Sequence, residues 1–103
     1  MREMVALTSA SLDETFETLS DEQRRRLLYY LSESSDGTAT VEELIELLGG
    51  NAQQTEIRLR HVHIPYLRDT AMVDYDDRTE TVRYRETPFL ERIIECCPDE
   101  FTS

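Results

Sequence analysis

The stretch from Asn51 to Tyr84 constrains the fold of this chain more than any other. Asn51 can cap a helix, and the helix-like segment after it runs straight into V-D-Y, a polar turn at 76–79 and V-R-Y. The alternation in those two runs predicts two short strands joined as a hairpin. A helix followed directly by such a hairpin has the order of a recognition helix and its wing. The segment therefore predicts a winged helix-turn-helix domain.

Two helices and a loop are predicted upstream of that segment. Ser11 can cap the first helix. Ser20 can cap the second, with Gln23 completing a capping box, and this helix runs to about Ser32. Residues 34–38, S-S-D-G-T, predict a loop by composition. Leu12, Phe16 and Leu19 form one apolar face of the first helix, and the second helix is expected to bury Leu27, Leu28 and Leu31.

The third predicted helix has the clearest boundaries. Thr40 and Glu43 form a capping-box pattern at its start. Gly49 and Gly50 end it and supply the tight turn that a helix-turn-helix needs. Within the fourth helix, Pro65 removes one backbone donor and is expected to kink or end the regular part. The third helix is expected to bury Val41, Leu44, Ile45 and Leu48.

A closing helix is expected after the hairpin. Thr87 and Pro88 suit its cap and first turn, and Pro98 is expected to stop it. A chain of 103 residues suits one compact domain. The expected fold class is α+β, mainly α: a winged helix-turn-helix with a two-stranded wing and an extra C-terminal helix. The expected divisions are a flexible arm over 1–10, the domain over 11–98 and a tail over 99–103.

Charge is the outlier of the composition. Asp and Glu number 22 against 11 basic residues, for a formal net charge of -11, and every basic residue is Arg. Abundant carboxylates without Lys are typical of proteins from extreme halophiles, where molar salt screens repulsion over ~3 Å. An ordinary acidic protein is the alternative. At ordinary salt such a surface repels phosphates, whereas molar salt reduces both that repulsion and the gain from counterion release.

The sequence shows no membrane or export signal. No apolar run approaches the ~20 residues of a membrane span, and the opening M-R-E-M-V-A-L-T-S-A lacks the apolar core of a signal peptide. Cys96 and Cys97 are adjacent, which places them poorly for an ordinary disulfide, so reduced thiols are expected. The expected location is the cytoplasm.

Polar side chains on the fourth helix and the hairpin are the candidate DNA contacts. Asn and Gln can read adenine and Arg can read guanine by paired hydrogen bonds, and Arg on a wing can meet phosphates. The alternative is that these positions are only solvated faces of an amphipathic helix and an exposed hairpin. The candidates are Asn51, Gln53, Gln54, Thr55, Arg58 and Arg60 on the helix, and Arg78, Arg83 and Arg85 on the hairpin.

Two apolar stripes run along the fourth helix. The first can face the core. The second lies well round the helix, where a free-standing reading helix has no need of it. It can pack under the hairpin or the last helix, or it can bind a protein partner. The first stripe is Ile57, His61, Ile64 and Leu67, and the second is Leu59, Val62 and Tyr66.

His61, His63, Cys96 and Cys97 are the residue types closest to a metal site. Two helical residues spaced as H-x-H point about 200° apart. Packing with a hydrogen bond is therefore favoured for both histidines, and buried thiols for both cysteines. A nucleophile elbow, a phosphate loop and a convincing carboxylate pair are all lacking. No metal, cofactor or enzyme activity is expected.

The first and last helices are expected to pair two copies of the chain. Winged helix proteins often dimerise through terminal helices, so that two reading heads match a two-fold DNA site. The alternative is that these helices only complete the core of a monomer. The residues expected in the interface are Leu12, Phe16, Leu90, Ile93, Ile94 and Cys97.

The run L-R-H-V-H-I-P-Y-L-R-D-T-A-M-V-D-Y-D, from Leu59 to Asp76, resembles a haloarchaeal family of small winged helix-turn-helix proteins. In that family the helix ends in a pattern like L-x-H-x-H-L-P-x-L-x-D-x-G-x-V-x-Y-D. The segment S-D-E-Q-R-R-R-L-L-Y-Y-L is similar to the family's L-S-N-x-R-R-R-x-x-L-x-x-L opening. Ala71 stands where the family usually has Gly, and Tyr66 replaces a commonly charged residue.

The resemblance covers roughly Leu12 to Tyr84. It implies a transcriptional regulator related distantly to the arsenic-repressor-like superfamily. Together with the residue pattern, it predicts a cytoplasmic, dimeric protein that binds double-stranded DNA. The alternative is a dimeric protein-interaction module on the same fold, which uses the second apolar stripe and does not bind DNA.

Overall fold

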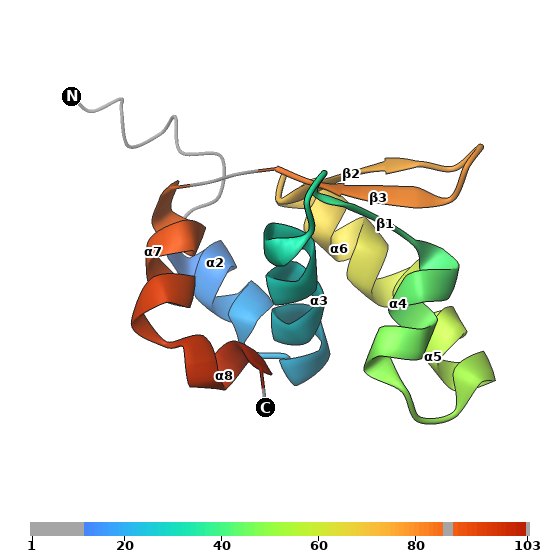
Figure 1. The fold of residues 1–103 in the computed structure, drawn as a ribbon, viewed down its shortest axis with the longest axis horizontal. Helices are drawn as coiled ribbons and strands as arrows, with labels where there is room; N and C mark the ends of the chain where they lie inside the picture. The colour runs from blue at the N-terminus through green and yellow to red at the C-terminus, as the bar shows by residue number, and fades with distance from the viewer. Residues whose placement is uncertain (1–11, 86–87, 103) are drawn as a thin grey trace.

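Residues 12–85 and 88–102, which the computed structural model describes, form a mainly helical fold with a three-stranded antiparallel sheet (Figure 1). The arm expected over 1–10 and the caps expected at Ser11 and Thr87 lie outside the described residues. In chain order the elements are α2 (Leu12–Leu19), α3 (Glu22–Glu33), β1 (Thr38–Thr40), α4 (Val41–Leu48), α5 (Ala52–Arg58), η1 (Leu59–His63), α6 (Ile64–Asp69), β2 (Val73–Asp76), β3 (Thr81–Tyr84), α7 (Pro88–Cys96) and α8 (Pro98–Thr102).

The helices gather on two sides of α3. In Figure 1, α2, α7 and α8 lie on one side, and α4, α5 and α6 lie on the other, below the sheet. A single cluster of buried side chains runs through both groups and reaches the sheet at Ala39, Val73 and Val82. Leu27, Leu28 and Leu31 of α3 are fully buried at its centre, as the sequence predicts.

The N-terminus of α3 lies one residue later than predicted. Asp21 is the N-cap, and its carboxylate accepts hydrogen bonds from the backbone N–H groups of Gln23 (2.8 Å) and Arg24 (3.3 Å). The Ser20 hydroxyl instead donates to the carbonyl oxygen of Glu17 in α2 (2.6 Å). The predicted Ser20–Gln23 capping box is therefore wrong. Ser20 and Asp21 both have side chains that can cap a helix, and the carboxylate of Asp21 is favoured by the positive end of the helix dipole.

The start of α4 and the turn into α5 confirm the prediction. The Glu43 N–H donates to the Thr40 hydroxyl (3.1 Å), and the Thr40 N–H donates to the Glu43 carboxylate (2.9 Å). Gly49 follows with a φ of 71°, a conformation that a Cβ disfavours. The Asn51 side chain then accepts from the Gln54 N–H (2.9 Å) and caps α5.

A third strand precedes α4 where the sequence predicts only a loop and a cap. β1 pairs antiparallel with β3, and the strand order is β1-β3-β2. The predicted hairpin is confirmed, with Val73 and Tyr75 opposite Tyr84 and Val82. The expected two-stranded wing is therefore the outer part of a three-stranded sheet. The sequence misses β1 because its three residues, T-A-T, are too few to show an alternating pattern.

α5, η1 and α6 form one helical segment with a wide turn in its middle. In η1 the Ile64 N–H donates to the carbonyl of Leu59, five residues back, which is π-helical hydrogen bonding. The wide turn stands directly before Pro65, whose ring would clash with the carbonyl of His61 in a regular α-helix. The helix then continues to Asp69. The proline thus follows a widened turn and does not end the helix.

The wide turn changes which side chains of this segment face the core. A π turn adds one residue to the repeat, so buried positions before it are displaced by one residue relative to those after it. Both predicted stripes are therefore wrong, because each mixes buried with exposed residues. Leu59 (0% exposed), Ile64 (3%) and Leu67 (0%) are buried, Ile57 (51%) and Val62 (44%) are exposed, His61 is exposed and Tyr66 is half-buried.

The turn from α6 into β2 is built on Ala71, which has a φ of 64°. The Met72 N–H donates to the Leu67 carbonyl (2.9 Å), and the Ala71 N–H donates to the Arg68 carbonyl (3.0 Å). These two bonds make a Schellman motif, and Met72 and Leu67 are both buried, as its apolar contact requires. The left-handed position of this motif is usually Gly because a Cβ is disfavoured there.

Ala71→Gly should raise the free energy of unfolding by about 1 kcal/mol. The left-handed conformation costs a residue with a Cβ roughly 1–2 kcal/mol, and the greater entropy of Gly in the unfolded chain offsets part of the gain. Urea denaturation at constant molar KCl measures the change. Ala52→Gly, the same change at an exposed helical position, is the control and should destabilise. Equal losses in the two variants would contradict the strain at Ala71.

The C-terminal residues form a helix and not the tail predicted for 99–103. α8 begins at Pro98 and packs against α3. Phe101 is 2% exposed, and the carbonyl of Glu100 accepts from Nε of Arg25 on α3 (2.8 Å). The prediction is wrong because a proline that ends one helix also suits the first turn of another. A single apolar residue after it gives no periodic signal.

Candidate nucleic-acid interface

The front of α5 is exposed because its back is anchored at two points. Thr55 is 5% exposed, and its hydroxyl donates to the carbonyl of Gly49 (2.9 Å), which ties α5 to the turn before it. One turn later, Leu59 is fully buried in the core. The rest of the first two turns therefore faces outward. The exposed residues there are Asn51, Ala52, Gln53, Gln54, Ile57 and Arg58.

Thr55 consequently leaves the set of predicted DNA contacts. Its side chain is buried and its hydroxyl is already engaged, so it cannot reach a base edge. A threonine suits an exposed helical position and a buried one equally well, and the sequence carries no signal that separates the two. The hydrogen bond to the Gly49 carbonyl is what turns the Thr55 side chain inward.

Arg58 extends from the exposed face toward the start of α3. Its Nη2 lies 3.9 Å from Oδ2 of Asp21, and its side chain is 52% exposed. Desolvation by burial raises the pKa of Asp21, but the backbone N–H groups of Arg24 and Gln23 hold that pKa below its usual value overall. Exposed ion pairs contribute only ~0–1 kcal/mol. Arg58 can therefore exchange this partner for a phosphate or a base at little cost.

Arg60 faces the hairpin and not the space in front of α5. Its Nε lies 2.9 Å from Oε2 of Glu56, and its Nη2 lies 3.2 Å from Oε1 of Glu80 in the β2–β3 turn. The hydrogen bonds with Glu80 and Glu56 raise the pKa of Arg60. The prediction that Arg60 is available for DNA contact is therefore wrong, because both carboxylates already engage its side chain. This side chain joins the helical segment to the hairpin and positions one against the other.

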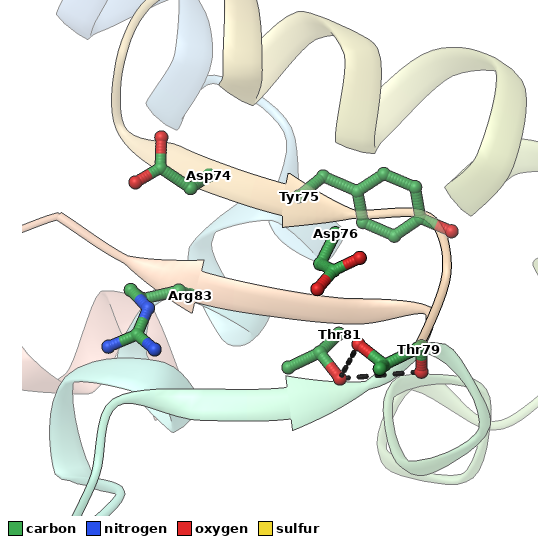
Figure 2. A pocket seen from close by; sticks show the side chains of 6 residues that line it. All are labelled: Asp74, Tyr75, Asp76, Thr79, Thr81 and Arg83. Atoms are coloured by element: carbon green, nitrogen blue, oxygen red, sulfur yellow. Dashed lines mark hydrogen bonds between the residues drawn. The ribbon is translucent and has the colours of Figure 1, made fainter.

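The outer face of the hairpin mixes Arg with carboxylates (Figure 2). Asp74 pairs across the strands with Arg83, and its Oδ1 lies 3.2 Å from Nη1 of Arg85. Asp76 accepts from the backbone N–H of Arg78 (2.9 Å) and shapes the turn. An open pocket on this face is lined by Asp74, Tyr75, Asp76, Thr79, Thr81 and Arg83.

The hairpin is slightly acidic as a whole. Residues 73–85 contain the carboxylates of Asp74, Asp76, Asp77 and Glu80 and the guanidinium groups of Arg78, Arg83 and Arg85, four against three. In the part of the chain that the structure describes, Arg78 and Arg83 are exposed and form no ion pair, whereas Arg85 is paired with Asp74. Among the predicted phosphate contacts of the hairpin, Arg78 and Arg83 are therefore the side chains that have no carboxylate partner within the described residues.

His63 links the helical segment to α2 and α3 from the inside. The ring is fully buried, and its Nε2 lies 2.9 Å from Oε1 of Gln23, so Nε2 carries the proton and donates. Its Nδ1 lies 3.5 Å from Nη1 of Arg24 and accepts. Arg24 also donates to the Thr18 carbonyl (2.9 Å) and lies 4.5 Å from the centre of the Tyr66 ring. The packed, hydrogen-bonded histidine is confirmed at this position, but the network around it was not predicted.

The burial of His63 should make stability depend on pH. Desolvation lowers the pKa of His63 below its usual 6.5, aided by Arg24 and Arg58 and opposed by Asp21. As the pH falls through about 6.5, the unfolded chain takes up a proton that the folded protein refuses. Stability should then fall by up to about 1.4 kcal/mol per pH unit until His63 itself is protonated. Above about pH 6.5, His63 is neutral in both the folded and the unfolded chain, so this loss of stability is absent.

Urea denaturation at about pH 7 and about pH 5 measures this dependence. His63→Gln should reduce the difference in unfolding free energy between the two conditions. His61→Gln is the matched control, because His61 is exposed, and it should keep the wild-type difference. The same pH dependence in both variants would show that His63 is not its source.

The residues predicted for a dimer interface do not share one exposed face. An amphipathic sequence cannot distinguish a face that packs inside the monomer from one that packs between two copies. The prediction is therefore wrong at Leu90 and Ile94, which belong to the core. Leu90 is 1% exposed and Ile94 7%, Ile93 is half-buried, Phe16 and Cys97 are exposed, and the side chain of Leu12 lies outside the described part.

The residue types of a metal site are not brought together. Cys96 and Cys97 are exposed free thiols, contrary to the predicted burial. His61 is exposed and His63 is buried, so the two rings do not face one site. Within 12–85 and 88–102, no group of three or more His, Cys, Asp or Glu side chains is arranged to hold a metal ion. Across the same ranges, no helix has the length and apolar character needed to span a membrane.

Comparison with known proteins identifies no relative. No protein-family model, curated protein or solved structure matches the chain.

Proposed function

We propose that the protein is a winged helix-turn-helix transcriptional regulator that binds double-stranded DNA. The order of elements supports the proposal: α3, β1 and α4 precede the long helical segment, and the hairpin follows it. α4, the glycine turn and α5 have the connection of a helix-turn-helix. The hairpin is part of the sheet order β1-β3-β2 and stands where a wing is expected.

The exposed front of α5 is the observation that carries the proposal. In a helix-turn-helix, residues near the N-terminus of the second helix contact base edges in the major groove. Gln53, Gln54 and Arg58 occupy those positions and are exposed. The start of α5 and the tip of the hairpin lie at the same end of the molecule (Figure 1). One duplex laid across that end can touch α5 with its groove and Arg78 with its backbone.

The net charge of -11 sets the conditions for binding. In dilute buffer the carboxylates repel phosphates over a distance of ~10 Å or more, whereas molar salt shortens this range to ~3 Å. Ordinary DNA-binding proteins lose affinity as salt rises, because they gain most from counterion release. We expect the reverse for this protein, as one that works in molar salt. Its affinity for DNA in molar KCl should equal or exceed its affinity in dilute buffer.

Arg58→Ala should weaken DNA binding about tenfold, which is ~1.4 kcal/mol. Fluorescence anisotropy with duplexes selected from the DNA upstream of its own gene, in molar KCl, measures the dissociation constant. Arg92→Ala is the control, because Arg92 is exposed on α7, away from α5 and the hairpin. Its affinity should equal that of the wild type. Absence of any complex at every salt concentration would refute DNA binding.

A second candidate function is a protein-interaction module that does not bind DNA. The observation that favours it is the exposure of Ile57 (51%) and Val62 (44%) on the helical segment. Leu59 is buried, so the face differs from the one that the sequence predicts. A stable protein partner that is lost with Val62→Asp, together with absence of DNA binding, would favour this function.

Pairing of two copies is part of the proposal. A two-fold dimer would present two α5 helices to one DNA site. Among the predicted interface residues whose side chains the structure describes, Phe16, Ile93 and Cys97 stay at least partly exposed. Sedimentation equilibrium in molar KCl measures the mass, and a strictly monomeric protein would remove this part of the proposal.

A further inference from the structure

The exposed side chains at the front of α5 are of two chemical kinds, amide and aliphatic. Gln53 and Ile57 are four residues apart, and Gln54 and Ile57 are three apart, so these side chains are neighbours on the helix surface. All three are exposed, and Ile57 is 51% exposed. In the part of the chain that the structure describes, the side-chain amides of Gln53 and Gln54 make no hydrogen bond.

The cationic side chains of the same segment are directed elsewhere. Arg60 is held by Glu56 and Glu80 at 2.9 and 3.2 Å. Arg58 lies toward Asp21, the N-cap of α3, at 3.9 Å. The chain contains no Lys at all. Guanine is read chiefly by Arg or Lys at its O6 and N7 atoms, and among the exposed side chains of α5 only Arg58, on the side next to α3, is of this kind.

We infer that α5 reads A·T base pairs, with the amides of Gln53 and Gln54 on adenine and the side chain of Ile57 against a thymine methyl group. A Gln side chain can donate to N7 and accept from the N6 amino group of adenine in the major groove, and an aliphatic side chain packs on the methyl group of thymine. The inference rests on the proposed DNA binding and names the sequence class that this surface selects.

Molar salt favours base recognition by amide and aliphatic side chains over recognition by Arg. Molar salt weakens contacts between Arg and phosphate, whereas hydrogen bonds to base edges and apolar contacts inside the groove are screened much less. A face that depends on amide and aliphatic groups keeps its selectivity under those conditions. Ile57 is half-exposed in the free protein. In the complex its exposed surface would pack against the thymine methyl group and be shielded from water, which is favourable.

Uracil in place of thymine removes the methyl group and leaves base pairing intact, which gives a direct test. Duplexes are first selected from a random library with the wild-type protein in molar KCl, and we expect A·T-rich sequences. Uracil at the contacted position should weaken wild-type binding about fourfold, the value of one buried methyl group. Ile57→Ala should bind the thymine duplex less tightly than the wild type and should show no further loss with uracil.

The controls separate failure of the inference from failure of DNA binding. Gln53→Ala should lose its preference for A·T at one position but keep the uracil effect, because Ile57 is intact. Thermal melts of Ile57→Ala should match the wild type, since the side chain is exposed. Selection of G·C-rich sequences, or equal uracil effects in wild type and Ile57→Ala, would overturn the inference while DNA binding stands. Recovery of no duplex at all would refute the proposed function itself.

Discussion

Phe101→Ala should lower the free energy of unfolding by about 3–5 kcal/mol. The ring is 2% exposed and belongs to α8, a helix of five residues that is too short to be stable alone. Packing of α8 against α3 therefore depends on this side chain. Its loss leaves a cavity and removes the apolar anchor of the C-terminus. Urea denaturation at constant molar KCl measures the change.

Glu100→Ala is the matched control for this substitution. The Glu100 side chain is exposed, and the contact with Arg25 uses the backbone carbonyl of Glu100, which the variant keeps. Its effect should stay within about 0.5 kcal/mol. If Phe101→Ala were equally mild, residues 99–103 would behave as the tail that the sequence alone predicts.

Leu59→Ala should lower the free energy of unfolding by about 2–5 kcal/mol, whereas Val62→Ala should change it by no more than about 0.5 kcal/mol. Leu59 is fully buried, and Val62 is 44% exposed. The difference follows from the π turn of η1, which turns Leu59 inward and leaves Val62 at the surface. The same denaturation series measures both variants.

A regular α-helix makes a different prediction for this pair. In that register Leu59 and Val62 belong to one stripe, and their substitutions should have similar effects. Ile57→Ala adds an independent check, because Ile57 belongs to the predicted core stripe and is 51% exposed. A large loss in Ile57→Ala with a small loss in Leu59→Ala would contradict the wide turn.

Local signals in the sequence predicted the parts of the fold that neighbouring residues decide. The Thr40–Glu43 capping box and the Asn51 cap each join residues three positions apart, so both can be seen in the chain itself. The hairpin is equally local, because Val73 pairs with Tyr84 across a short turn. Each of these predictions is confirmed.

The candidate site was predicted only in outline. Gln53, Gln54 and Arg58 are exposed as expected. Thr55 and Arg60 are not available, because contacts with Gly49 and Glu80 engage them. These partners lie six and 20 residues away in the chain, and a periodic pattern carries no information about such pairs.

The sequence by itself determined where most helices and the hairpin begin and end, because caps, glycines and alternation act over a few residues. The tertiary structure alone decided three other features. These are which side chains of the α5–η1–α6 segment are buried, the presence of β1 as a third strand, and the folding of the last residues into α8. A π turn before Pro65, a three-residue strand against β3 and a single anchor at Phe101 each gain their stability from packing with distant parts of the chain. That energy is absent from any local stretch, and it also decides which side chains α5 leaves exposed.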